Sequence, residues 1–69
     1  MKISMEEKRQ NASEIFRRIH DCKSEEDLER MDDILEESMM ADRILKKDYK
    51  FLSEELDDQI SYLVGKGLI

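Results

Sequence analysis

The sequence is poor in the residues that interrupt helices and in those that favour strands. Its 69 residues include no proline, no tryptophan, no threonine and one valine, and both glycines lie within the last five positions. Sandwich and barrel folds need turn residues every ~8 to 12 positions and many β-branched residues, so an all-β fold is excluded. Because a chain this short forms one small domain at most, we expect a single all-α domain over residues 1–69, a small helical bundle.

Long apolar runs are also absent. No segment approaches the ~18 consecutive apolar residues of a membrane-spanning helix, and Glu6 and Glu7 stand where a signal peptide would have its apolar core. The lone cysteine, Cys22, cannot form a disulfide within the chain and fits a reducing compartment. We therefore expect a soluble cytoplasmic protein without a membrane partner.

The residues that carry chemistry are equally scarce. The only histidine and the only cysteine, His20 and Cys22, are two positions apart and would point to different sides of a helix. A structural zinc site needs four ligands, and with glycine only at Gly65 and Gly67 no phosphate-binding loop can form. We expect no catalytic residue, no metal and no cofactor, with His20 in a last helical turn and Cys22 packed as a small apolar side chain.

The first helix is expected over residues 5–21. Ser4 followed three residues later by Glu7 matches the capping box that begins a helix. The apolar residues that follow fall on one stripe at helical spacing, with Cys22 at its edge: Met5, Ala12, Ile15, Phe16 and Ile19. Ser24, followed by acidic residues, marks the start of a second helix at position 25.

Beyond Ser24 the apolar residues follow a heptad pattern. Two series offset by three positions form a helix-packing seam that runs to Val64, with Gly65 at the expected C-terminal cap. The apolar members of this seam are Leu28, Met31, Leu35, Leu45, Tyr49, Leu52, Leu56 and Leu63. Two successive seam positions, Ser38 and Asp42, are polar, so the helix is expected to bend or break there.

Two architectures follow from this pattern. In the first, the chain reverses near residues 38–42 and three helices, about 5–21, 25–40 and 42–64, form one bundle. In the second, residues 25–64 form one continuous helix of about 60 Å that the first helix covers only in part. The exposed seam would then pair with a second copy. Since chains of this size gain much from association, we expect a homodimer.

Charge is distributed unevenly along the chain. Residues 1–23 carry a net charge of +2, residues 24–42 carry −8, and residues 43–69 are neutral. On a helix, five carboxylates of the middle segment would lie opposite Met31 and Leu35 and form an acidic ridge: Glu25, Glu29, Asp32, Asp33 and Glu36. The basic residues on either side of this segment are expected to pair with it, in the chain or across a dimer: Lys8, Arg9, Arg17, Arg18, Arg43, Lys46, Lys47 and Lys50.

These features favour a non-enzymatic, acidic interaction or regulatory protein. The apolar seam would associate with another helix, and the acidic ridge would select a partner protein that has a basic surface. Nucleic acid is a disfavoured partner, because the ridge repels phosphates. Two alternatives are a nucleic-acid-associated protein that uses the basic cluster at residues 43–50, and a purely structural oligomerisation module.

Overall fold

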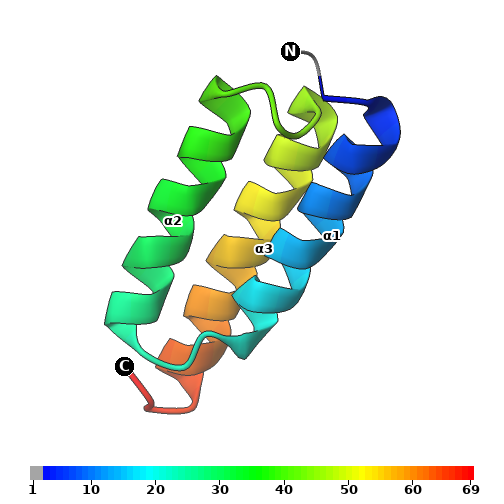
Figure 1. Ribbon diagram of the computed structural model, residues 1–69. Helices are drawn as coiled ribbons and strands as arrows, with labels where there is room; N and C mark the ends of the chain where they lie inside the picture. Colours follow the sequence, from blue (N-terminus) through cyan, green and yellow to red (C-terminus); the bar gives the residue numbers. More distant parts are fainter. Residues whose placement is uncertain (1–2) are drawn as a thin grey trace.

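The computed structural model describes residues 3–69 and contains three helices: α1 (Met5–Asp21), α2 (Glu25–Met40) and α3 (Lys46–Gly65). They lie side by side in an elongated bundle of 43 × 16 × 16 Å, with α1 and α3 running in one direction and α2 in the other (Figure 1). The three-helix architecture is confirmed, and the continuous helix over residues 25–64 is wrong. None of the three helices is long and apolar enough to cross a membrane.

The first two helices begin where their capping residues predict. The Ser4 hydroxyl accepts a hydrogen bond of 3.2 Å from the backbone N–H of Glu7, and the Ser24 hydroxyl accepts one of the same length from Asp27. Each bond satisfies a backbone donor that the first helical turn leaves without a partner. These side chains fix the starts of the two helices, which span residues 5–21 and 25–40.

The reversal between α2 and α3 is built around Asp42, which has a positive φ of 57°. The backbone N–H of Arg43 donates to the carbonyl of Ser38 at 2.8 Å, and that of Asp42 donates to Met39 at 3.1 Å. This pair of bonds is a Schellman motif, the usual way to end a helix with one left-handed residue. The chain needs three further residues to reach α3, which begins at Lys46 rather than near residue 42.

The loop after Asp42 is anchored to the rest of the bundle. Ile44 is only 2% exposed and belongs to the core. From α1, Lys8 forms an ion pair of 3.1 Å with Asp42, and the Asn11 side-chain amide donates to the carbonyl of Arg43 at 3.0 Å. The reversal is thus held by the burial of Ile44 and by two polar contacts from α1.

The core lies along the common axis of the three helices. Its members are Ala12, Ile15, Ile19, Cys22, Leu28, Met31, Leu35, Ile44, Leu52, Leu56 and Leu63. The predicted stripe on the first helix is therefore only partly right: Met5 is 63% exposed and Phe16 is 37% exposed. Two neighbouring helices cover a narrower strip of α1 than the stripe that the spacing outlines.

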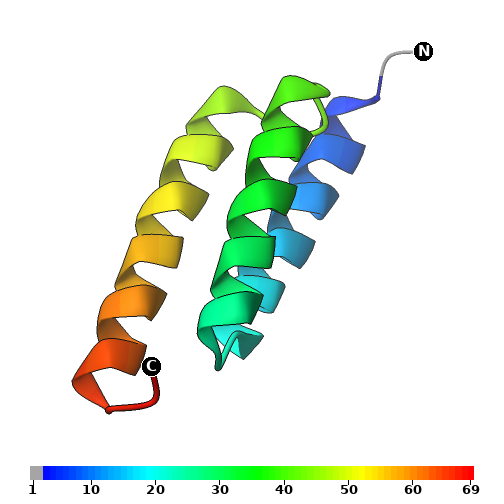
Figure 2. The same cartoon turned by 90° about the vertical axis from the view of Figure 1, so that its left-hand side faces the viewer.

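The C-terminal end of α3 differs from the prediction: the helix ends one residue after Val64, and its left-handed capping residue lies two residues after Gly65. Gly65 is the last helical residue, and Gly67 has the positive φ, 72°. The N–H of Leu68 donates to the carbonyl of Leu63 at 2.9 Å and that of Gly67 donates to Val64 at 3.0 Å, which forms a second Schellman motif. This turn directs the last two residues back towards α2 (Figure 2).

Candidate functional site

The fold buries most of the predicted seam inside the chain. The core takes up six of its eight residues, Leu28, Met31, Leu35, Leu52, Leu56 and Leu63. Tyr49 is half-buried and packs against the core, and Leu45 is half-buried at the N-cap of α3. The expectation that a second molecule covers this seam is therefore corrected: α1 covers it, through Ile15 and Ile19.

An open groove of ≈ 550 Å³ lies between α2 and α3, two helices that lie next to each other in Figure 2. It runs along the N-terminal half of α2 and the C-terminal half of α3, which lie side by side because the helices are antiparallel. Its lining combines apolar and acidic side chains and consists of Glu25, Leu28, Glu29, Asp32, Leu56, Asp57, Ile60, Val64 and Ile69.

The floor and walls of the groove are apolar. Leu28 and Leu56 are each 5% exposed and form the floor, where the groove meets the core. Ile60, Val64 and Ile69 remain between a third and two thirds exposed on the α3 side. The C-terminal turn at Gly67 is what brings Ile69 into this lining. These side chains leave apolar surface open to solvent beside the core.

The rim of the groove is acidic. Glu25, Glu29 and Asp32 stand four and three residues apart on one edge of α2, and Asp57 faces them from α3. In residues 3–69, no lysine or arginine nitrogen lies within 4 Å of these four carboxylates. Their mutual repulsion is therefore not relieved inside the chain, and a cation brought by another molecule would relieve it.

The predicted acidic ridge is thus divided between two surfaces. All five of its residues are exposed, but Glu25, Glu29 and Asp32 line the groove whereas Asp33 and Glu36 do not. Glu25, Glu29 and Asp32 face solvent at the edge of α2 beside Leu28. Sequence reasoning missed Asp57, Ile60 and Val64, whose relation to α2 depends on how the chain reverses.

The basic cluster lies at the other end of the bundle. Arg43, Lys46, Lys47 and Lys50 surround the start of α3, whereas the groove lies at the start of α2 (Figure 1). The expected pairing with the acidic segment occurs at Lys8 and Asp42, 3.1 Å apart. For the cluster itself the expectation is wrong within the chain: in the described residues none of its nitrogens lies within 4 Å of a carboxylate.

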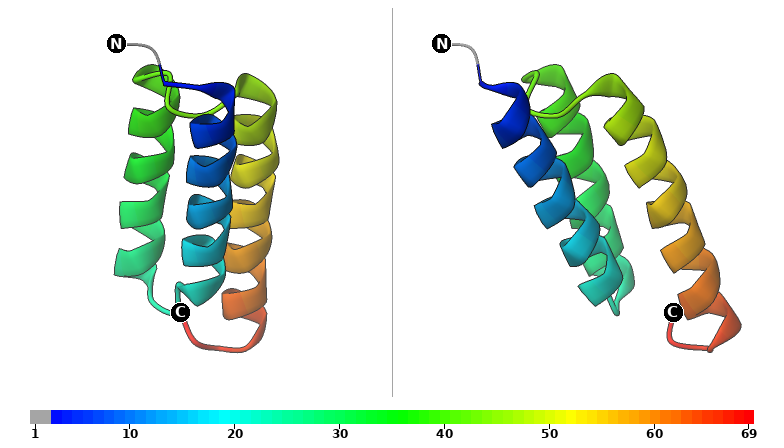
Figure 3. Two further views of the ribbon diagram at one scale, coloured as in Figure 1. Left: turned by 45° about the vertical axis from the view of Figure 1, so that its right-hand side comes forward. Right: turned by 90° about the vertical axis from the view of Figure 1, so that its right-hand side faces the viewer.

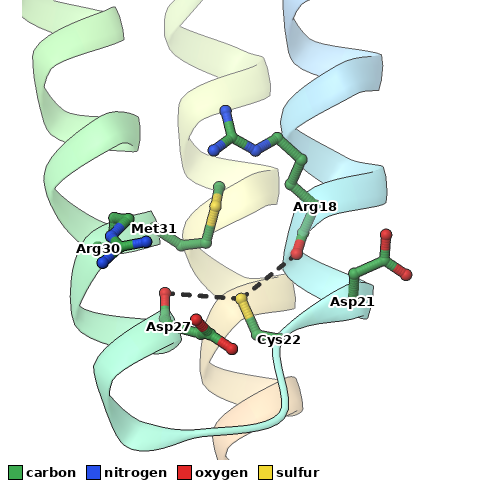
Figure 4. A pocket seen from close by; sticks show the side chains of 6 residues that line it. All are labelled: Arg18, Asp21, Cys22, Asp27, Arg30 and Met31. Carbon is green, nitrogen blue, oxygen red and sulfur yellow. Dashed lines mark hydrogen bonds between the residues drawn. The ribbon is translucent and has the colours of Figure 1, made fainter.

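The environment of Cys22 is that of a packed side chain. A cavity of ≈ 260 Å³ opens beside it (Figure 4), and its thiol lies 3.3 Å from the carbonyl oxygen of Arg18 and 3.6 Å from that of Asp27. Burial, followed by the charge of Asp27, raises the pKa of the Cys22 thiol above its ordinary value. A thiol held in its protonated form is a poor nucleophile, so Cys22 serves packing, as the sequence predicts.

Two further observations bear on chemistry. Gln59, the one buried polar side chain of the described core, donates from Nε2 to the carbonyl of Cys22 at 2.9 Å and so ties α3 to the end of α1. Residues 3–69 contain no group of three histidine, cysteine or acidic side chains placed to hold a metal ion.

Comparison with known proteins gives this chain no relative, since no family model, no curated protein and no solved structure matches it. The functional argument therefore depends on the groove and on the surface charge.

Proposed function

We propose that this chain is a non-enzymatic interaction module whose groove between α2 and α3 binds a basic, amphipathic helix of another protein. The observation that supports the proposal best is the composition of the groove, an apolar floor framed by four carboxylates with which no lysine or arginine of residues 3–69 forms an ion pair. The apolar floor favours burial of a partner's apolar stripe. The acidic rim favours lysine or arginine beside that stripe and raises the association rate.

The dimensions of the groove suit a helix as the bound element. Glu25 and Asp32 on the rim are seven positions apart, which is ~10.5 Å of helix at ~1.5 Å per residue. An amphipathic helix presents apolar anchors at i, i+3 or i+4, and i+7, and these span the same length. A partner helix of two to three turns would thus place its anchors on Leu28 and Leu56 and its basic residues against both rims.

The proposed module acts by covering its partner's helix, so that this helix is not free for other contacts. We propose a cytoplasmic location, because a lone free thiol fits a reducing compartment. Nucleic acid is the competing class of partner, since the cluster at residues 43–50 is open to phosphate.

The proposal is tested by calorimetric titration with a designed helical peptide that carries leucines at i, i+4 and i+7 and lysines on both flanks. The double variant Glu29→Lys/Asp32→Lys reverses two rim charges and is expected to raise the dissociation constant at least about tenfold. The matched control Asp33→Lys/Glu37→Lys makes the same charge change on exposed positions of α2 outside the groove. It is expected to change the constant by less than about threefold.

Equal weakening by the two double variants would show that only net charge attracts the peptide, and the groove would lose its assigned role. A parallel titration with duplex DNA and single-stranded RNA completes the test. Nucleic-acid binding tighter than peptide binding, steeply weakened by salt and lost in Lys46→Glu/Lys50→Glu, would replace the proposal with the nucleic-acid alternative.

A further inference from the structure

A second apolar surface lies on the face formed by α1 and α3, which run side by side in the same direction (Figure 3). Phe16 of α1 and Phe51 of α3 are 37% and 50% exposed, and their rings stack with centroids 5.9 Å apart at an interplanar angle of 18°. Beside them, Phe16 contacts the ring of His20 at 4.6 Å, and His20 Nε2 lies 3.2 Å from Glu55 Oε2. The two stacked phenylalanine rings form an apolar centre on this face that is partly exposed to water, and burying it against another surface is favourable.

The charges around this centre are arranged along α3 in a particular order. The first five residues of the helix include three lysines, Lys46, Lys47 and Lys50, and the following segment 54–58 includes four carboxylates. At 100° per residue, Lys47, Phe51 and Asp58 fall within ~40° of one another, so they share one face of the helix. That face is basic at Lys47, apolar at Phe51 and acidic from Glu54, which lies within ~40° of Asp58, to Asp58 itself.

A surface with this order is complementary to itself when it is turned by 180°. A two-fold dimer requires such a surface, because the same patch is used by both subunits. An axis midway between Phe51 and Glu54 would place Lys47 opposite Asp58 of the second copy, and Asp58 opposite its Lys47. It would place each Phe51 opposite Glu54 of the other copy, with the two Phe51 side chains ~4.5 Å apart along the helix direction. The groove between α2 and α3 lacks this property, since its rim carries only negative charge.

We infer that the α1–α3 face binds a second copy of this chain, with the two α3 helices antiparallel across a two-fold axis near Phe51. The dimer interface is separate from the groove, so both subunits keep their grooves free for a partner. This inference stands apart from the proposed function, because it depends on the aromatic pair and on the charge order of α3.

Sedimentation equilibrium of the full chain with charge-reversed variants tests the inference. Lys47 and Asp58 are both exposed, so Lys47→Glu and Asp58→Lys are expected to keep the fold. Two-fold symmetry places each changed contact twice in a dimer, and each variant alone is expected to raise the dimer dissociation constant at least about tenfold. An equimolar mixture of the two variants restores both ion pairs, and its heterodimer is expected to lie within about threefold of the wild-type constant.

Matched controls separate this interface from the rest of the surface. Lys23→Glu and Glu37→Lys reverse exposed charges elsewhere and should leave dimerisation unchanged, as should the groove variant Glu29→Lys/Asp32→Lys. A wild-type chain that stays monomeric up to about 1 mM would overturn the inference. So would a mixture that dimerises as weakly as its separate components, since the antiparallel register then could not be present.

Discussion

Replacing Asp42 by glycine in one variant and by alanine in another tests the reversal between α2 and α3. The test is which of the two variants has the higher free energy of unfolding. Asp42 has φ 57° and its side chain pairs with Lys8. Both substitutions remove that ion pair, so the difference between the two variants reports on the backbone alone. In a reversal the position must be left-handed, whereas in a continuous helix over residues 25–64 it would be helical.

The expected difference in unfolding free energy between Asp42→Gly and Asp42→Ala has opposite signs in the two arrangements. A left-handed conformation costs a residue with a Cβ atom about 1 kcal/mol more than glycine, so Asp42→Gly is expected to be more stable than Asp42→Ala by this amount. In a helix interior alanine is favoured over glycine by about 1 kcal/mol. The two arrangements therefore differ by about 2 kcal/mol in this single comparison, well above the error of a paired measurement.

Urea denaturation followed by circular dichroism at 222 nm provides the assay, with a common m-value required for both variants. The bundle predicts a higher unfolding midpoint for Asp42→Gly. A higher midpoint for Asp42→Ala would refute the reasoning, because it would mean that position 42 is helical.

Three further predictions concern stability. Leu35 is only 1% exposed, and Leu35→Ala is expected to lower the free energy of unfolding by about 3 kcal/mol in chemical denaturation. Met40 is 77% exposed, and Met40→Ala should lower it by less than about 0.5 kcal/mol. Similar losses for the two variants would show that Leu35 is not in the core. Gln59→Ala is expected to cost about 2 kcal/mol, because it leaves the carbonyl of Cys22 without its buried donor, and an unchanged unfolding midpoint would show that this bond is absent. Burial raises the folded-state pKa of the Cys22 thiol above its ordinary value of 9.0, so the unfolded chain releases this proton first. The thiol therefore contributes to the free energy of unfolding below pH 9.0, and this contribution is lost as the pH rises from 9.0 through the folded-state pKa. Over that range the unfolding free energy of the wild-type chain should fall more than that of Cys22→Ala. Equal decreases would contradict the burial of the thiol.

The sequence predicts the parts of this fold that depend on neighbouring residues. Ser4 and Ser24 fix the starts of two helices because a cap acts within three residues of itself. The polar seam positions Ser38 and Asp42 mark the reversal, since a polar pair cannot continue an apolar strip. The start of α3 had no such signal: Leu45 caps the helix without a side-chain hydrogen bond, and the buried Ile44 lies in a loop.

The groove could be predicted only in part, because its two sides come from distant segments. The sequence identifies Glu25, Glu29 and Asp32 as exposed, and they are. Their place beside Ile60 and Val64 requires α2 and α3 to be antiparallel and in a given register, which the two alternative architectures left open. Phe16 shows the same limit, since its helical position allows burial but no neighbouring helix covers it fully.

Nuclear magnetic resonance with isotope-labelled protein and the designed basic peptide tests the central claim most directly. The account predicts that the largest shifts of the amide signals occur at residues that line the groove, among them Leu28, Asp32, Ile60 and Val64. Signals around Phe16 on the α1–α3 face should change little. Shifts confined to residues 43–50, or spread evenly over the surface, would contradict the account.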